Sequence, residues 1–272
     1  MTLSAKLAAG ALAVIFTGSL LAGFIAPHSY DEQFREAAGS LPSRQFPLGT
    51  DDLGRDRLSR LLYGSRVSLV MAPCAAVVST LLAGLIGGIA GMLGGRWERA
   101  FMTGTDLFLS LPWLFLLIAV RALLPLNTAP SVSVGITFLL LGSLGWAPAA
   151  RVVRAAAHDL RCAQFTLQAR IAGISETRLF WRHLLPNLRP VLTAQFLISI
   201  PVFIIAEANL GLLGLGVSEP LPSLGAMLRD LENLSAVLQS PLRNPGLFAP
   251  LILLMLVVTC FQLLLRKEQP VR

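Results

Sequence analysis

The chain alternates long apolar runs with shorter polar segments, and six runs are long enough to cross a bilayer, which takes about 20 apolar residues in a helix. These runs are residues 7–26, 67–93, 100–120, 131–150, 191–217 and 246–265. The pattern predicts an all-α integral membrane protein with six transmembrane helices in one domain, residues 1–272. Because the first run is longer than the apolar part of a typical signal peptide, we favour an uncleaved first helix over a signal peptide.

The composition supports a membrane protein and excludes several other classes. Hydrophobic residues make up 54% of the 272 residues and charged residues 14%, which is too apolar for an ordinary soluble domain. The net charge of +7 is divided among the segments between apolar runs, so it does not indicate a nucleic acid partner. Cys74, Cys162 and Cys260 lie far apart, which predicts neither a disulfide framework nor a metal site.

The distribution of basic residues predicts the orientation. If both termini are cytoplasmic, the inner segments contain 13 Lys and Arg against 4 acids, and the outer segments contain 9 against 9. Cytoplasmic loops of membrane proteins carry an excess of Lys and Arg. The rule therefore places residues 27–66 outside and residues 151–190, which contribute seven arginines, in the cytoplasm.

The segment before the second run, residues 46–69, reads FPLGTDDLGRDRLSRLLYGSRVSL. Its glycines favour turns, and its first aspartate can bond its own backbone in an Asx-turn. The segment resembles the PLGTD-x-x-GRD-x-x-SR-x-x-x-G-x-R-x-SL sequence of peptide and nickel ABC importer permeases, in the subunit type called the C component. We favour a helix on the membrane surface that sets the entry angle of the second span over direct substrate contact. The resemblance marks Gly49, Thr50, Asp51, Gly54, Arg55 and Asp56.

Two acidic residues interrupt apolar runs. Asp106 precedes LSLP, and Glu207 opens a stretch that resembles the family's EASLSFLGLGV sequence. An ionised acid at bilayer depth costs at least about 2.5 kcal/mol, so Asp106 is expected to face the bundle or a wet cavity. For Asp106 we favour a hydrogen bond between helices over a place on the translocation path. After Glu207, three glycines favour close helix packing, with a gate as the alternative.

The arginine-rich block at residues 151–190 contains small residues that would let a short helix fit closely into a groove on a partner. Ser175 is a predicted helix start, and Pro186 is expected to end or kink the helix. It resembles the cytoplasmic EAA loop of ABC importer permeases, in which a glycine is followed at fixed spacing by LP. Leu167 stands where that pattern has its acidic residue, and Gln168 replaces an alanine. By resemblance, this helix–turn–helix docks on an ATP-binding subunit; the alternative is a basic loop that holds anionic lipid. The residues assigned to coupling are Ala169, Arg170, Ala172, Gly173, Ser175, Leu185 and Pro186.

The resemblance covers most of the chain and implies the MetI-like fold of type I ABC importer permeases. It implies a multi-pass subunit of the bacterial inner membrane that imports peptides or similar small solutes. The implied partners are a second permease chain, two ATP-binding subunits that hold ATP and magnesium, a periplasmic or lipid-anchored solute-binding protein, and membrane lipid. The chain itself has no P-loop and no hydrolase or metal motif, so we expect it to be no enzyme and to bind no cofactor. The alternative is a stand-alone secondary transporter that uses Asp106 and Glu207 as ion sites.

Overall fold

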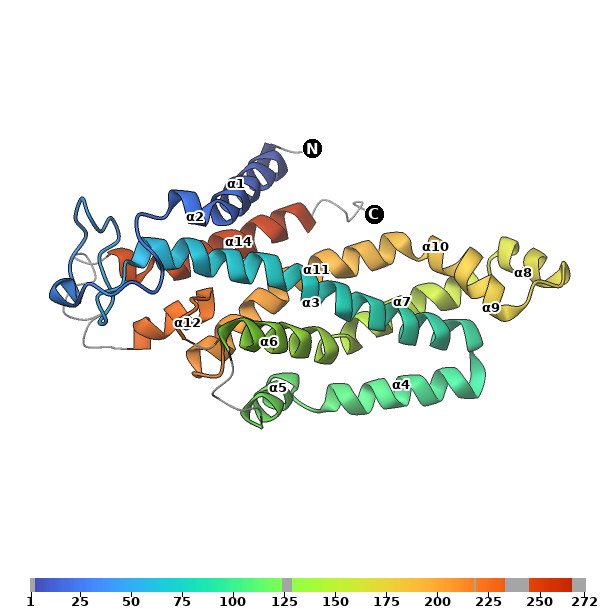
Figure 1. The fold of residues 1–272 in the computed structure, drawn as a ribbon. Helices are drawn as coiled ribbons and strands as arrows, with labels where there is room; N and C mark the ends of the chain where they lie inside the picture. Colours follow the sequence, from blue (N-terminus) through green and yellow to red (C-terminus); the bar gives the residue numbers. More distant parts are fainter. Residues whose placement is uncertain (1–2, 124–128, 218, 233–244, 266–272) are drawn as a thin grey trace. The chain divides into compact units, whose positions relative to one another are not determined.

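The computed structural model describes residues 3–123, 129–217, 219–232 and 245–265, and every regular element among them is helical (Figure 1). The α-helices are α1 (Leu3–Leu20), α2 (Ala22–Ile25), α3 (Arg57–Leu93), α4 (Gly95–Ser110), α5 (Trp113–Ala122), α6 (Pro130–Leu144), α7 (Ala147–Arg161), α8 (Gln164–Ile171), α9 (Glu176–Leu179), α10 (Leu185–Asn187), α11 (Arg189–Leu212), α12 (Leu224–Leu228) and α14 (Ala249–Leu265). The other helical segments are η1 (Arg35–Ala37), η3 (Arg229–Glu232) and η4 (Pro245–Leu247), which are 3-10 helices, and η2 (Phe180–Leu184), which is a π-helix.

The prediction of helical membrane spans is confirmed, but the predicted number of six is not. Among the described residues, α1, α3 and α11 are each long and apolar enough to cross a membrane. The number becomes five if the bent pairs α4–α5 and α6–α7, which turn by 74° and 41°, each count as one span. α14 is apolar but, with 17 residues, is shorter than α1, α3 and α11. The larger bend lies at Pro112, whose ring disfavours the α-helical conformation of the preceding residue, and Leu111 is extended.

Two helices extend beyond the apolar runs that predicted membrane spans. α3 begins at Arg57 rather than at residue 67, so residues 57–66 form its first turns and not a separate surface helix. A helix of this length measures about 55 Å, which exceeds the hydrocarbon core of roughly 30 Å, so its polar start extends beyond the bilayer. Similarly, α7 continues to Arg161, so the block at 151–190 begins inside a helix.

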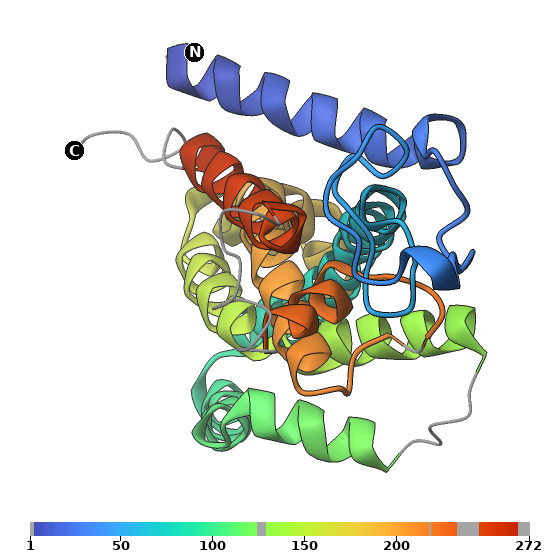
Figure 2. The ribbon, with the colours of Figure 1, turned by 90° about the vertical axis from the view of Figure 1, so that its left-hand side faces the viewer.

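The chain divides into two compact units, and the divisions fall inside α3, α5, α6 and α11. The first unit consists of residues 1–72, 121–138 and 201–272. In it, α1 packs along α14, as Figure 2 shows, and α14 also contacts α12. The end of α11 approaches α12 so closely that a side chain at Gly211 would overlap the backbone of Gly225. Small residues therefore set the helix distance here, as is common between membrane helices.

The second unit consists of residues 73–120 and 139–200. Its α3 segment lies against α7 through glycines, because a side chain at Gly87 or Gly91 would overlap α7 backbone at Ala150 or Arg154. Beside this contact is a buried cluster to which α3, α7 and the chain from η2 to Leu188 contribute. Its members are Ala83, Met92, Ala149, Ala150, Val153, Ala157, Phe180, Leu184 and Leu188. The cluster anchors the start and the end of the 151–190 block to α3.

Candidate functional site

The predicted coupling loop is a helix–turn–helix in which α8 and α9 lie side by side (Figure 1). α8 ends in a Schellman turn: Gly173 N–H donates to the Arg170 carbonyl over 3.0 Å, and Ile174 N–H donates to the Ala169 carbonyl over 3.1 Å. Gly173 has φ +76°, in the left-handed region that other residues avoid, whereas a Cβ there would meet nothing within 4 Å. The glycine is therefore required for backbone conformation, whereas the sequence suggested that it was chosen for small size.

The two arms of the loop are joined by a bidentate ion pair across the turn. Arg170 donates from Nε to Glu176 Oε1 over 2.8 Å and from Nη2 to Oε2 over 3.1 Å. Ser175 occupies the expected position before α9 with an extended backbone, but its side chain makes no capping hydrogen bond. Ala169 is buried and Ala172 is exposed, so these two small residues occupy different environments.

The sequence predicted an end or a kink at Pro186, and the second arm does not end there. The chain stays helical through η2, α10 and α11, and the proline is accommodated by the π-helical turn that precedes it. Proline cannot donate a hydrogen bond to the carbonyl four residues earlier, and here a π-helical turn stands directly before it. Leu185 packs against the buried cluster, and Asn187 Nδ2 donates to the His183 carbonyl over 2.6 Å.

The outer surface of the loop is apolar as well as basic. Leu167 and Ile171 lie one turn apart on α8, and both are exposed, Ile171 to 87%. Phe165 and Trp181 are also exposed. Exposed apolar side chains gathered on a short surface helix are typical of a protein contact. Leu167, which replaces the acidic residue of the EAA pattern, belongs to this surface.

The motif before α3 folds into a compact turn whose side chains bond to its own backbone. Asp51 Oδ1 accepts from Leu53 N–H over 3.0 Å and from Arg55 N–H over 2.8 Å, which is the predicted Asx-turn. Asp56 Oδ2 accepts from Ser59 N–H over 3.0 Å and thus caps the start of α3. Gly49 and Gly54 have φ of +73° and +78°. Thr50, buried beside them, accepts from Ser40 N–H over 2.8 Å.

Arg55 connects this turn to a distant segment of the same unit. Its Nε donates to Asp51 Oδ2 and its Nη1 to Glu219 Oε2, both over 2.6 Å. Arg60 Nη2 donates to the other oxygen of Glu219 over 3.4 Å. Burial alone would lower the pKa of Arg55, but its bonds and attraction to the two carboxylates outweigh this and raise that pKa. Glu219 was not singled out from the sequence, where no local signal relates it to residues over 150 positions away.

The two acids in apolar runs lie in different environments. Glu207 of α11 is fully buried and accepts from Ser68 Oγ over 3.1 Å, and the same hydroxyl accepts from Leu224 N–H over 3.4 Å. Asp106 of α4 is 54% exposed, and its Oδ1 lies 3.6 Å from Nε of Arg151 on α7. It therefore forms an ion pair between helices rather than the expected hydrogen bond, and it does not face the interior of its unit. α4 packs against α7, and most of its side chains are exposed.

Arg121 is a buried polar residue that the sequence placed just outside the third run. It lies within α5, donates from Nε to the Leu215 carbonyl over 3.2 Å and from Nη2 to the Gly216 carbonyl over 3.2 Å. A further bond of 2.7 Å reaches Ser133 Oγ of α6. The guanidinium group thus satisfies two backbone carbonyls in the segment just after the end of α11.

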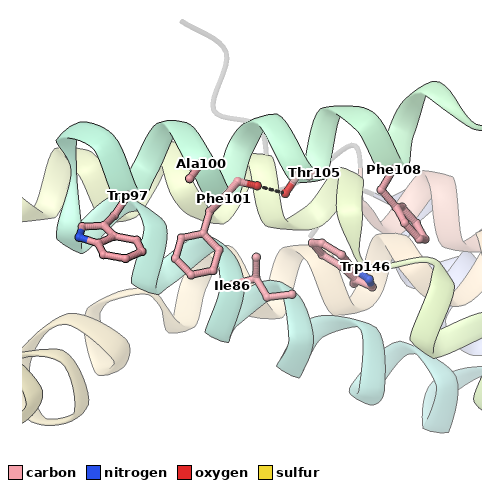
Figure 3. A pocket seen from close by; sticks show the side chains of 8 residues that line it. Ile86, Trp97, Ala100, Phe101, Thr105, Phe108 and Trp146 are labelled. Atoms are coloured by element: carbon pink, nitrogen blue, oxygen red, sulfur yellow. Dashed lines mark hydrogen bonds between the residues drawn. The ribbon is translucent and has the colours of Figure 1, made fainter.

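An open groove of about 480 Å³ runs between α4 and the neighbouring helices of its unit, and Figure 3 shows it lined almost wholly by aromatic and aliphatic side chains. The Thr105 hydroxyl donates back to the Phe101 carbonyl over 2.8 Å, so it offers no free donor to a ligand. The lining residues are Ile86, Trp97, Ala100, Phe101, Gly104, Thr105, Phe108 and Trp146. Such a surface suits lipid chains or apolar side chains and not a charged solute. Within the described ranges, no group of three His, Cys, Asp or Glu is arranged to hold a metal ion.

The chain is similar in sequence to known transport proteins. Residues 83–267 match the family model of the binding-protein-dependent transport system inner membrane component. The oligopeptide transport system permease protein OppC of Mycobacterium bovis is 34% identical over 81% of this chain and 74% of its own length. The di/tripeptide permease protein DppC of Pseudomonas aeruginosa is 36% identical over 82% and 73%, and the dipeptide permease protein DppC of Bacillus subtilis is 31% identical over 80% and 67%. With the family model matching well over half of its length, this chain belongs to the family of binding-protein-dependent transport system inner membrane components.

Proposed function

We propose that the chain is the C-type permease subunit of an ATP-driven importer that moves peptides, or solutes of similar chemistry, across the bacterial inner membrane. The assignment of a peptide substrate rests on the similar proteins, whose names assign them to oligopeptide and dipeptide transport. The coupling role rests chiefly on one observation, the Gly173 turn that presents Leu167 and Ile171 on an exposed helix.

In this proposal the membrane domain has six spans, with α14 as the last, and belongs to the MetI-like type I importers. The excess of basic residues in the inner segments supports cytoplasmic termini and an inner position for residues 151–190. Residues 27–66, which precede the membrane part of α3, are then periplasmic. The length of α3 agrees with this, because its first turns reach beyond the hydrocarbon core.

The partners follow from the same assignment. A second, related permease chain completes the pathway, and a periplasmic or lipid-anchored binding protein delivers the solute. Two ATP-binding subunits hold ATP and magnesium, and this chain holds no cofactor of its own. The apolar surface on α8 is the proposed contact with one of them. Its movement is passed through the rigid Gly173 turn and the buried cluster to α3 and α7, which changes access to the pathway.

Nothing favours the alternative of a stand-alone secondary transporter. Such a protein would need ion sites within reach of a water-filled path. Glu207 is fully buried and bonded to Ser68, and Asp106 pairs with Arg151 on an exposed helix face.

Reconstitution tests the function. Proteoliposomes that contain this chain, the related permease, both ATP-binding subunits and a peptide-loaded binding protein should accumulate labelled peptide only with ATP. Uptake by this chain alone, driven by a proton or sodium gradient, would overturn the proposal.

Native Cys162 tests the orientation, because it is exposed beside α8. In cells without the ATP-binding subunits, with Cys74→Ser and Cys260→Ser in the background, a membrane-impermeant maleimide should label Cys162 only after inverted vesicles are prepared. Ser29→Cys, in the segment before α3, is the matched control and should be labelled in intact cells. The reverse pattern would invert the proposed topology.

A further inference from the structure

Two buried arginines near the start of α3 share one exposed carboxylate. Arg55 and Arg60 have side chains that are 10% and 5% exposed, whereas the Glu219 side chain that joins them is 59% exposed. The distances are 2.6 Å from Arg55 Nη1 and 3.4 Å from Arg60 Nη2 to the two oxygens of Glu219. A solute in solvent would therefore reach the two guanidinium groups at the position that the Glu219 carboxylate fills.

Glu219 is the most exposed of the carboxylates that act on the two arginines. Asp51 is the second carboxylate, bonded to Arg55 Nε over 2.6 Å and 3.8 Å from Arg60 Nε. Asp230 of η3 is a third, half-buried acid whose charge also acts on Arg60. In addition, Arg60 Nη1 is buried and has no hydrogen-bond partner in the part of the chain that the structure describes. An unpaired buried donor of this kind favours a further acceptor.

Glu219 can leave without disturbing the surrounding helices. It lies between α11 and α12, outside any helix, and the carbonyls of Leu215 and Gly216 are held separately by Arg121. Rotation of this one exposed side chain would vacate the site. What remains is a pair of guanidinium forks whose geometry matches a carboxylate.

We propose that Arg55 and Arg60 form a carboxylate-binding site on the outer face, that Glu219 occupies it in the resting state, and that the free carboxylate of an incoming peptide replaces Glu219. This rests on the proposed function and adds a recognition step for the acidic end of the solute. Glu219→Gln removes the competing charge while keeping the shape, so it should strengthen binding of the solute carboxylate. A charge-assisted hydrogen bond of ordinary strength corresponds to about tenfold in affinity.

The experiment uses the complete importer in proteoliposomes and one peptide in two forms, with a free and with an amidated C-terminus. Glu219→Gln should lower the KM for the free peptide about tenfold and leave the KM for the amidated peptide unchanged. Glu219→Asp, which keeps the charge on a shorter side chain, should give a smaller decrease. Glu36→Gln removes an exposed acid from the segment before α3 and should change neither value.

Each other outcome has a defined meaning. If Glu219→Gln alters both peptides equally, Glu219 is only a structural latch and the proposal is overturned; the melting temperature in detergent should then fall as well. If it instead alters ATPase stimulation by the unloaded binding protein, the carboxylate comes from that protein and the solute assignment is overturned. Absence of uptake of either peptide by the wild type contradicts the proposed function itself. Wild-type uptake with the same KM for both forms in every variant contradicts only the carboxylate site.

Discussion

Ile174 donates its backbone N–H to the carbonyl of Ala169 over 3.1 Å, and this bond closes the turn between the two arms of the coupling loop. The bond forms because Gly173, between them, adopts φ +76°. The Arg170–Glu176 ion pair lies across the same turn. One local backbone conformation thus determines the direction in which α8 presents its exposed face.

Gly173→Val should uncouple ATP hydrolysis from transport. A β-branched residue at positive φ is strained by roughly 1–2 kcal/mol, and the turn should relax into another conformation. ATPase activity of the complex should lose its stimulation by the loaded binding protein, while the chain still inserts in the membrane.

Gly173→Asn is the matched control, because asparagine tolerates the left-handed region and closes such turns in other proteins. A Cβ at this position would meet nothing within 4 Å, so its added bulk should not matter. Equal loss of coupling in both variants would show that bulk, and not the backbone, is what the site excludes.

Ile171→Ser should weaken binding of the ATP-binding subunits. Its side chain is 87% exposed, so truncation costs the isolated chain little stability, whereas a contact that buries it would lose apolar area. We expect about tenfold weaker association, measured by titrating purified ATP-binding subunits against the permease pair in nanodiscs. Leu53→Ser, an exposed leucine in the segment before α3, should leave the association unchanged.

The helix–turn–helix of α8 and α9 was predictable because its signals are local. A glycine after one amphipathic helix and Ser-Glu before the next fix a helix–turn–helix within about a dozen residues, and the structure has that arrangement. The role of Leu167 was less evident: the pattern revealed the missing acid, but only the fold shows that Leu167 shares an exposed apolar face with Ile171.

What the sequence did not reveal depends on contacts between distant residues. Glu219 meets Arg55 only after α3 and α11 have packed, and no spacing rule relates them. Arg121 was excluded from the third run because it is charged. In the structure it is buried and donates hydrogen bonds to two backbone carbonyls after α11. Hydropathy likewise cannot foresee that α4 and α5 meet at 74°.

Asp230→Asn should raise the thermal stability of the chain at neutral pH. Burial raises the pKa of Asp230, and attraction to Arg57 and Arg60 opposes this only in part. The folded state therefore favours protonated Asp230. The contribution of Asp230 to stability is complete below the ordinary aspartate pKa of about 3.9, and it is lost as the pH rises through the higher pKa that Asp230 has in the folded chain.

The asparagine variant should therefore melt at a higher temperature than the wild type at pH 7, and the difference should shrink on acidification toward pH values of about 4. Differential scanning fluorimetry in detergent across this range measures it. Glu36→Gln, at an exposed acid, should show no such pH-dependent difference. A destabilised Asp230→Asn at neutral pH would mean that attraction to the arginines outweighs burial.

Gly54→Ala should disrupt the turn that precedes α3. The glycine has φ +78°, and a Cβ there would overlap the carbonyl oxygen of Phe34, whose N–H donates to the Gly54 carbonyl over 3.0 Å. Both the backbone strain and the collision oppose the substitution. Gly39→Ala is the matched control, since Gly39 has φ +63° but a Cβ would meet nothing within 4 Å.

Gly39→Ala should cost only the backbone strain of roughly 1–2 kcal/mol. Gly54→Ala should cost more and should displace Asp51 and Arg55. Limited proteolysis of the segment before α3 in membrane vesicles measures this, and Gly54→Ala should be cut faster than Gly39→Ala. Equal cleavage would mean that the contact with Phe34 gives way easily. The carboxylate site of Arg55 and Arg60 would then not depend on a rigid turn.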